Sequence, residues 1–321
     1  MSAAFVPMFS GLLAFAFSLV FGPAVIRRLQ RLKVGQVIRS DGPKTHQAKA
    51  GTPTMGGVLI VLCTVAAILL TARPLTDSTV IMLLSTVGFG LIGFLDDYIK
   101  VVAKRSLGLR AREKLVGQFG LAALVAIYAA SRVGTEFIVP FWTGTITLPT
   151  VLYVPFTIFV LVGVVNAVNL TDGLDGLAAG STAIGAAAFA VIFLLLGHSD
   201  LSMFTSALAG ACLGFIWFNG PPAQVIMGDT GSFALGAALA TGAVLSRTSL
   251  FLPIIGGLFV LETVSVMLQV LYFRATKGRR LFRMAPLHHH FELVGWAESK
   301  VMIRFVLMSL VFAVLGLYAI L

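Results

Sequence analysis

Charged residues are scarce in this sequence, and their scarcity excludes most soluble classes of protein. Only 11% of the 321 residues are charged and 58% are hydrophobic, whereas soluble domains carry about a quarter charged residues. Apolar runs of roughly twenty residues, enough for a helix to cross a bilayer core of about 30 Å, follow one another along the chain. None alternates in the manner of a membrane barrel strand. We therefore predict an all-α integral membrane protein.

Cysteine and acidic residues are also few. The two cysteines, Cys63 and Cys212, lie inside apolar runs, which favours small core residues over a disulfide or a metal pair. The 13 acidic residues leave a formal charge of +10. Because no soluble segment could form a basic groove, we expect no nucleic acid partner, and instead membrane lipids with anionic headgroups and an anionic substrate.

Ten apolar runs predict ten transmembrane helices. They cover residues 5–26, 56–72, 79–95, 115–131, 150–166, 177–196, 201–217, 232–246, 250–273 and 301–321. Of the 23 basic residues, 20 fall in odd-numbered loops, so these loops are expected in the cytoplasm and the N- and C-termini outside. A short outer β-hairpin is predicted near 136–148. No repeat or low-complexity linker divides the chain, which favours a single domain over 1–321.

A polar cluster at 166–176 interrupts two of these runs. Asn166, Asn169, Asp172 and Asp175 recur at intervals of three, so at a helix end they would line one face and converge on one ligand. Polar residues are costly between apolar runs, and folding alone does not explain four of them. We predict a site for a hard cation and its phosphates at the membrane surface.

Two further acidic groups fall in predicted cytoplasmic loops. Asp96 and Asp97 are adjacent, so they repel unless a cation or basic group lies between them, and one of them suits proton abstraction. Asp229 stands between glycines before an apolar run, where it could bind a metal while the free amides of the helix start receive phosphate oxygens. The alternatives are a solvated pair for Asp96 and Asp97, and an N-cap for Asp229.

Three consecutive histidines, His288 to His290, are predicted on a loop. Neighbours on a loop cannot all bind one ion without strain, so donors to a sugar or phosphate are favoured over a zinc site, and solvated side chains are the alternative. Glu262 and Gln269 lie seven residues apart in one apolar run, on a face that we expect to point towards the cavity.

Five motifs occur in order, at 49–57, 96–98, 166–176, 227–232 and 286–292. Together they resemble the polyprenyl-phosphate N-acetylhexosamine-1-phosphate transferase superfamily, and within it the phospho-N-acetylmuramoyl-pentapeptide transferase family. The resemblance runs from about Arg39 to the C-terminus. The histidine motif distinguishes this family from the related UDP-N-acetylglucosamine transferases.

The resemblance implies a homodimer of ten-helix chains in the bacterial cytoplasmic (inner) membrane, with the active site on the cytoplasmic face. There Mg²⁺ would help undecaprenyl phosphate attack the β-phosphate of UDP-N-acetylmuramoyl-pentapeptide, giving lipid I and UMP. A related N-acetylglucosamine 1-phosphate transferase and a secondary transporter are the alternatives. Direct attack by the lipid phosphate, favoured because that phosphate is already largely ionised at neutral pH, and a covalent aspartyl intermediate are both open.

The resemblance also implies roles for individual residues. Asp229 is the expected Mg²⁺ ligand, Asp96 and Asp97 lie at the reacting centre, and His288, His289 and His290 lie near the sugar or leaving group. The remaining residues would bind substrate, with Lys100 and Lys114 facing phosphates; they are Lys49, Thr54, Lys100, Lys114, Asn166, Asn169, Asp172, Asp175, Asn219 and Gln269. One position departs from the family pattern: Ile226 replaces an aromatic residue that could stack on uracil.

Overall fold

The computed structural model describes residues 5–32, 51–103 and 108–321. Its long helices are α1 Phe5–Arg31, α2 Gly57–Thr71, α3 Asp77–Val102, α4 Ala111–Arg132, α5 Thr150–Thr171, α6 Leu177–Leu195, α7 Ser199–Asn219, α8 Gly228–Leu245, α10 Gly257–Ala275 and α12 Glu298–Tyr318. The short elements are β1 Glu136–Ile138, β2 Thr145–Thr147, the 3-10 turn η2 Ser249–Phe251, α9 Leu252–Ile255 and α11 Leu287–Val294.

The structure confirms a helical membrane protein. Among the described residues, eight helices are long and apolar enough to cross a bilayer: α1, α3, α4, α5, α6, α7, α10 and α12. Each of the ten apolar runs carries a helix, but α2 has only 15 residues and α8 has 18. The count of ten spans therefore stays a prediction.

Helix α8 forms the centre of the bundle. Every residue from Thr230 to Leu245 is buried, and the helix packs against α2, α3 and α5. Glycines allow the close approach: a Cβ on Gly57 of α2 would lie 2.1 Å from Gly231 Cα, and one on Gly93 of α3 would lie 2.1 Å from the Asp229 carbonyl oxygen. Small residues thus let neighbouring backbones hold the first turn of α8 in place.

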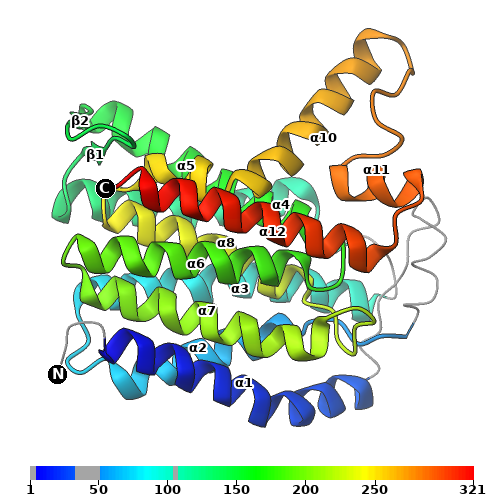
Figure 1. Ribbon diagram of the computed structural model, residues 1–321, viewed down its shortest axis with the longest axis horizontal. Coiled ribbons are helices and arrows are strands. Elements are labelled where there is room, and N and C mark those ends of the chain that lie inside the picture. The colour runs from blue at the N-terminus through cyan, green and yellow to red at the C-terminus, as the bar shows by residue number, and fades with distance from the viewer. Residues whose placement is uncertain (1–4, 33–50, 104–107) are drawn as a thin grey trace.

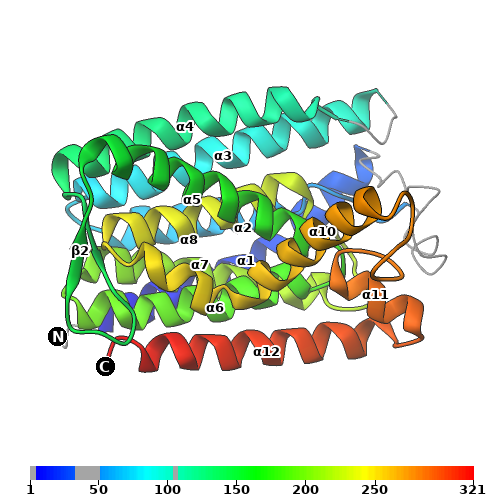
Figure 2. The same ribbon diagram turned by 90° about the horizontal axis from the view of Figure 1, so that it is seen from above.

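One end of the bundle holds the beginning of α1, the end of α12 and the β-strands (Figures 1 and 2). β1 and β2 pair antiparallel, with Phe137 opposite Ile146, and the Phe141 amide donates to the Ala319 carbonyl at 2.9 Å. Arg247, after α8, donates to Glu136 at 2.7 Å. Which side of the membrane this end faces stays a prediction.

The ninth apolar run is not one straight helix. It begins with η2 and α9, and α10 starts at Gly257. The Gly256 amide donates to the Leu252 carbonyl at 2.8 Å, and a Cβ on Gly256 would lie 2.7 Å from that oxygen. The chain turns here, and α10 leaves the bundle at an angle (Figure 1).

Candidate active site

Three carboxylates meet at the bundle end opposite the β-strands. Asp96 and Asp97 lie near the end of α3, and Asp229 lies in the first turn of α8. One oxygen atom of each lies within 4.8 Å of the others. Asp96 and Asp97 are buried and Asp229 is partly buried. Such a set of oxygens is of the kind that hard divalent cations bind.

Two ammonium groups join the carboxylates. Lys100 Nζ lies 2.6 Å from Asp96, 3.7 Å from Asp97 and 3.2 Å from Asp229. Lys114, in the first turn of α4, lies 3.0 Å from Asp96 and 2.8 Å from Asp229. The expectation of a basic group between Asp96 and Asp97 is confirmed, since Lys100 contacts both one helical turn later. The alternative of a solvated pair is therefore wrong.

Asp97 also caps α8. Its carboxylate accepts hydrogen bonds from the Asp229 amide at 3.1 Å, the Thr230 amide at 2.9 Å and the Thr230 hydroxyl at 2.8 Å. A negative charge here also complements the helix dipole. The expectation that these amides receive phosphate oxygens is thus wrong for this structure. The alternative that Asp229 is an N-cap is wrong as well, because Asp229 lies inside α8 and Met227 is the N-cap residue of this helix.

Asn169 orients the Asp229 carboxylate, and Ser232 in turn contacts Asn169. The Asn169 amide, at the end of α5, donates to Asp229 Oδ1 at 3.0 Å and to the Ser232 hydroxyl at 2.9 Å. One carboxylate oxygen of Asp229 is thus held by an amide and the other by two lysines. The side chain reaches the centre in a fixed direction.

Thr54 lies next to the same centre. The Ile226 amide donates to the Pro53 carbonyl at 2.8 Å, and the Gly56 amide donates back to Ile226 at 2.9 Å. A Cβ on Gly228 would lie 2.6 Å from Asp97 Oδ2 and 3.1 Å from Thr54 Oγ1. The segment before α2 therefore brings Thr54 beside Asp97. Lys49, predicted from the same motif, lies outside the described residues.

Comparison with known proteins shows similarity over nearly the whole chain. A family model described as Glycosyl transferase family 4 matches residues 79–247, and phospho-N-acetylmuramoyl-pentapeptide-transferase signature 1 matches residues 49–61. Proteins named phospho-N-acetylmuramoyl-pentapeptide-transferase from Desulforamulus reducens, Caldanaerobacter subterraneus subsp. tengcongensis and Bacillus subtilis are 52%, 49% and 47% identical to this chain. The aligned parts cover 95%, 97% and 97% of it and 93%, 98% and 97% of theirs. The chain belongs to the phospho-N-acetylmuramoyl-pentapeptide-transferase family.

Other residues that the family resemblance assigned to the substrate have contacts within the protein. Asn166 donates to Gln118 at 2.7 Å, Asp175 accepts from the Ala223 amide at 3.0 Å, and Asp172 is the C-cap of α5. The expectation that the four residues of 166–175 share one face is wrong. The helix ends at Thr171, so its periodicity does not extend to Asp172 and Asp175.

Asn219 joins two loops near the transferase site through hydrogen bonds. Its side-chain oxygen accepts from the Gly176 amide at 3.0 Å, and its amide donates to the Val225 carbonyl at 2.8 Å. The side chain is buried. It therefore ties the turn between α5 and α6 to the segment before α8, which contains Ile226.

The three histidines lie on a short helix, α11, and not on the predicted loop. Pro286, at its N-cap position, is well suited to precede a helix start. His288 is fully buried, with Nδ1 3.2 Å from Glu262 and Nε2 2.2 Å from where a Cβ on Gly173 would stand. It packs on the turn between α5 and α6, and its expected contact with a sugar or leaving group stays a prediction.

The other two histidines are partly buried. His289 Nδ1 lies 2.8 Å from Glu292 Oε2, and His290 Nδ1 accepts from the Arg283 amide at 3.1 Å. Neither is among the groups that surround Asp229. Their expected contact with a sugar or leaving group stays a prediction.

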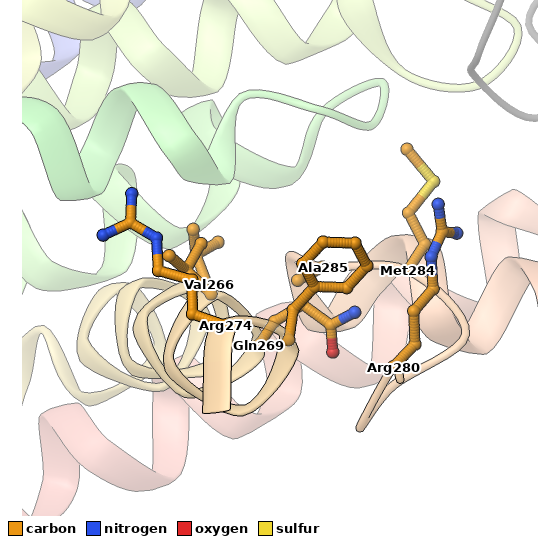
Figure 3. A pocket seen from close by; sticks show the side chains of 8 residues that line it. Val266, Gln269, Arg274, Arg280, Met284 and Ala285 are labelled. Carbon is orange, nitrogen blue, oxygen red and sulfur yellow. The ribbon is translucent and has the colours of Figure 1, made fainter. Parts of the chain in front are cut away.

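Gln269 lies beside a cavity of about 330 Å³ between α10 and the loop before α11 (Figure 3). Its side-chain oxygen accepts from the Leu281 amide at 3.1 Å and the Phe282 amide at 2.8 Å. Glu262, seven residues earlier, is fully buried. Glu262 and Gln269 thus face α11 and the loop before it, and the expectation that this face points towards the substrate cavity stays a prediction.

Sequence reasoning missed three polar residues near the centre: Gln118, Thr230 and Ser232. Thr230 and Ser232 lie one and three residues after Asp229, at the beginning of an apolar run. Polar residues at that position could have been predicted to belong to the same site. Gln118 is fully buried in α4, one turn after Lys114. A polar side chain inside an apolar helix is costly unless paired, so its position also pointed to a partner.

Proposed function

We propose that this protein transfers phospho-N-acetylmuramoyl-pentapeptide from its UDP-activated form to undecaprenyl phosphate, giving lipid I and UMP. The names of relatives that share about half of its residues over nearly the whole chain support this reaction. The observation that carries it is the centre formed by Asp96, Asp97, Asp229, Lys100 and Lys114. Because an attacking phosphate and a diphosphate are both anions, their reaction requires above all that their negative charge be neutralised.

We further propose that Asp229, with Asp96 and Asp97, holds Mg²⁺. The donor set fits, because three convergent carboxylates on two helices offer the oxygen ligands that this ion prefers. When bound, the ion would supply neutralisation of the diphosphate and of the leaving UMP. Asn169 supports the role by fixing one oxygen of Asp229.

The lysines bind and orient the phosphates in this scheme. Lys100 and Lys114 each contact two or three carboxylates, so their ammonium groups stay at the centre when no substrate is present. A lipid phosphate with a second pKa of about 6 is already largely ionised at neutral pH. Direct attack therefore needs little proton removal.

The location follows from the same proposal. Helices that can cross a membrane surround the centre, so a lipid acceptor can reach it from the bilayer and a nucleotide from water. The excess of basic residues in odd-numbered loops supports the cytoplasmic face of the bacterial inner membrane. We expect a homodimer from family membership.

An assay of UMP release tests the function. The purified protein should release UMP from UDP-N-acetylmuramoyl-pentapeptide only when polyprenyl phosphate is present. Turnover of UDP-N-acetylglucosamine alone would assign the related transferase reaction, and transport without UMP release would assign a transporter.

The metal proposal has its own test. Asp229→Asn, or removal of Mg²⁺ with a chelator, should abolish turnover while the protein elutes and unfolds as the wild type does. Full turnover in either case would refute the assignment of Asp229 as the metal ligand.

A further inference from the structure

Helix α4 carries Lys114 to the acid centre from the edge of the bundle (Figure 2). It packs mainly against α5 and α3 and makes only a small contact with α8. The position of Lys114 relative to Asp229 of α8 therefore depends on how α4 lies against its neighbours. Because Lys114 Nζ lies 2.8 Å from Asp229 and 3.0 Å from Asp96, a small displacement of α4 would weaken both contacts.

The buried face of α4 is apolar except at one position. Its buried residues are Gln118, Ala122, Val125, Ala126 and Ala129, and their spacing of three and four places them on one side of the helix. Alanine and valine side chains make no directional contacts, so on their own they define the register of α4 on its neighbours only loosely. A single polar residue in such a row can fix the register of two helices, as it does at a core position of a coiled coil.

Gln118 makes a directional contact with α5. The Asn166 amide donates to the Gln118 side-chain oxygen at 2.7 Å, and Gln118 is fully buried. Gln118 follows Lys114 by four residues, about one helical turn. Asn166 likewise precedes Asn169 by three residues. Lys114 and Asn169 in turn donate to opposite oxygens of the Asp229 carboxylate, at 2.8 Å and 3.0 Å.

The Gln118 amide has a cost for stability. Its Nε2 group has no hydrogen-bonding partner in the described part of the chain, and a buried amide donor without a partner is destabilising. An apolar side chain of the same shape would avoid this cost. Packing alone would therefore be served as well by an apolar residue, as at the other buried positions of α4.

We propose that Gln118 is a positioning residue for the transfer reaction. Through Asn166 it fixes the register of α4 on α5, and so brings Lys114 and Asn169 together on Asp229. The inference rests on the proposed function, because that reaction takes place at Asp229. Gln118 acts through these neighbours and not on the substrate. The effect can be large, since a displacement of about 1 Å can lower a rate about 100-fold.

Gln118→Met tests this role. The substitution keeps the shape of the side chain but removes both the acceptor for Asn166 and the unpartnered amide. The melting temperature in detergent should therefore equal or exceed that of the wild type, whereas kcat for UMP release should fall about tenfold or more. KM for UDP-N-acetylmuramoyl-pentapeptide should change less than about threefold, because the groups that bind the donor are retained and only their alignment in the transition state is lost.

A double-mutant cycle tests whether Gln118 acts through Asn166. Asn166→Leu should also lower kcat, and adding Gln118→Met to it should lower kcat little further, because the contact is already lost. Losses that multiply in the double variant would overturn the proposed pair. If Gln118→Met does not fold, Gln118→Asn takes its place in the cycle, since its amide is one methylene group too short to reach Asn166.

Thr86→Val is the matched control. Thr86 is buried in α3, and its hydroxyl has no hydrogen-bonding partner among the described residues. The change removes a buried unpartnered polar atom, as Gln118→Met does, but leaves the contact with Asn166 intact. The melting temperature should not fall, and kcat should stay within about twofold of the wild type.

The remaining outcomes each decide the question. Wild-type kcat in Gln118→Met would overturn the positioning role. Equal losses of kcat in Thr86→Val and Gln118→Met would also overturn it, because they would reduce the effect to a general disturbance of the core. Absence of UMP release by the wild type would refute the proposed function, and the positioning role with it.

Discussion

Asp97→Asn tests whether this carboxylate acts by holding α8. The carboxylate accepts three hydrogen bonds from the first turn of the helix. An asparagine has one acceptor oxygen, and its NH₂ group would face the Asp229 amide as a second donor. The change therefore removes at least one hydrogen bond to a charged group, about 1.5–3 kcal/mol, and the interaction of that charge with the helix dipole, about 0.3–1 kcal/mol.

The sum, about 2–4 kcal/mol, should lower the free energy of local unfolding of the first turn of α8. Hydrogen exchange of the amides of Asp229 and Thr230 should become about 30-fold faster or more, since about 1.4 kcal/mol corresponds to a factor of ten. Amides in the middle of α8 should exchange as in the wild type. Turnover should fall because Asp229 is no longer held in position.

Asp96→Asn is the control for this measurement. Asp96 accepts from the Leu109 amide at 2.7 Å and contacts Lys100 and Lys114, but makes no hydrogen bond to the α8 backbone. Asp96→Asn should reduce turnover, but hydrogen exchange of the amides at the start of α8 should be as slow as in the wild type. Unchanged exchange in Asp97→Asn would refute the capping role and leave Asp97 as a group that acts only on substrate or metal.

Two further substitutions test how α11 is held against the site. Gly173→Ala should displace His288, because a Cβ would stand 2.2 Å from its Nε2 atom; we expect a lower melting temperature and reduced turnover, and wild-type values for both would contradict the packing. Glu262→Leu should destabilise the protein by about 1–3 kcal/mol, since it leaves the buried His288 without its neighbour, whereas Glu262→Gln should retain most of the stability. Thermal unfolding in detergent measures the stability of both Glu262 variants. Equal losses of stability in the two would refute the contact between Glu262 and His288.

Much of the acid centre could be predicted from the sequence. Asp96, Asp97, Lys100 and Asn169 are polar residues near the ends of apolar runs, where each is costly without a partner. Charge placement put their loops on one side of the membrane, and the structure brings Asp96, Asp97 and Asp229 together.

The remaining features depend on packing between distant segments. The capping of α8 by Asp97 requires the contact of α3 with α8, which no local pattern encodes. The three-residue interval from Asn166 to Asp175 suggested one face only because the end of α5 at Thr171 was not recognised. The bend at Gly256 was hidden within a continuous apolar run.

The enclosure of α8 has a consequence for how the enzyme tolerates its surroundings. From Thr230 to Leu245 the helix has no exposed residue, so neighbouring helices stand between it and the acyl chains. Changes in bilayer thickness or fluidity would tilt the outer helices first. Asp229, in the first turn of this helix, should therefore keep its position when bacteria change their lipid composition with temperature.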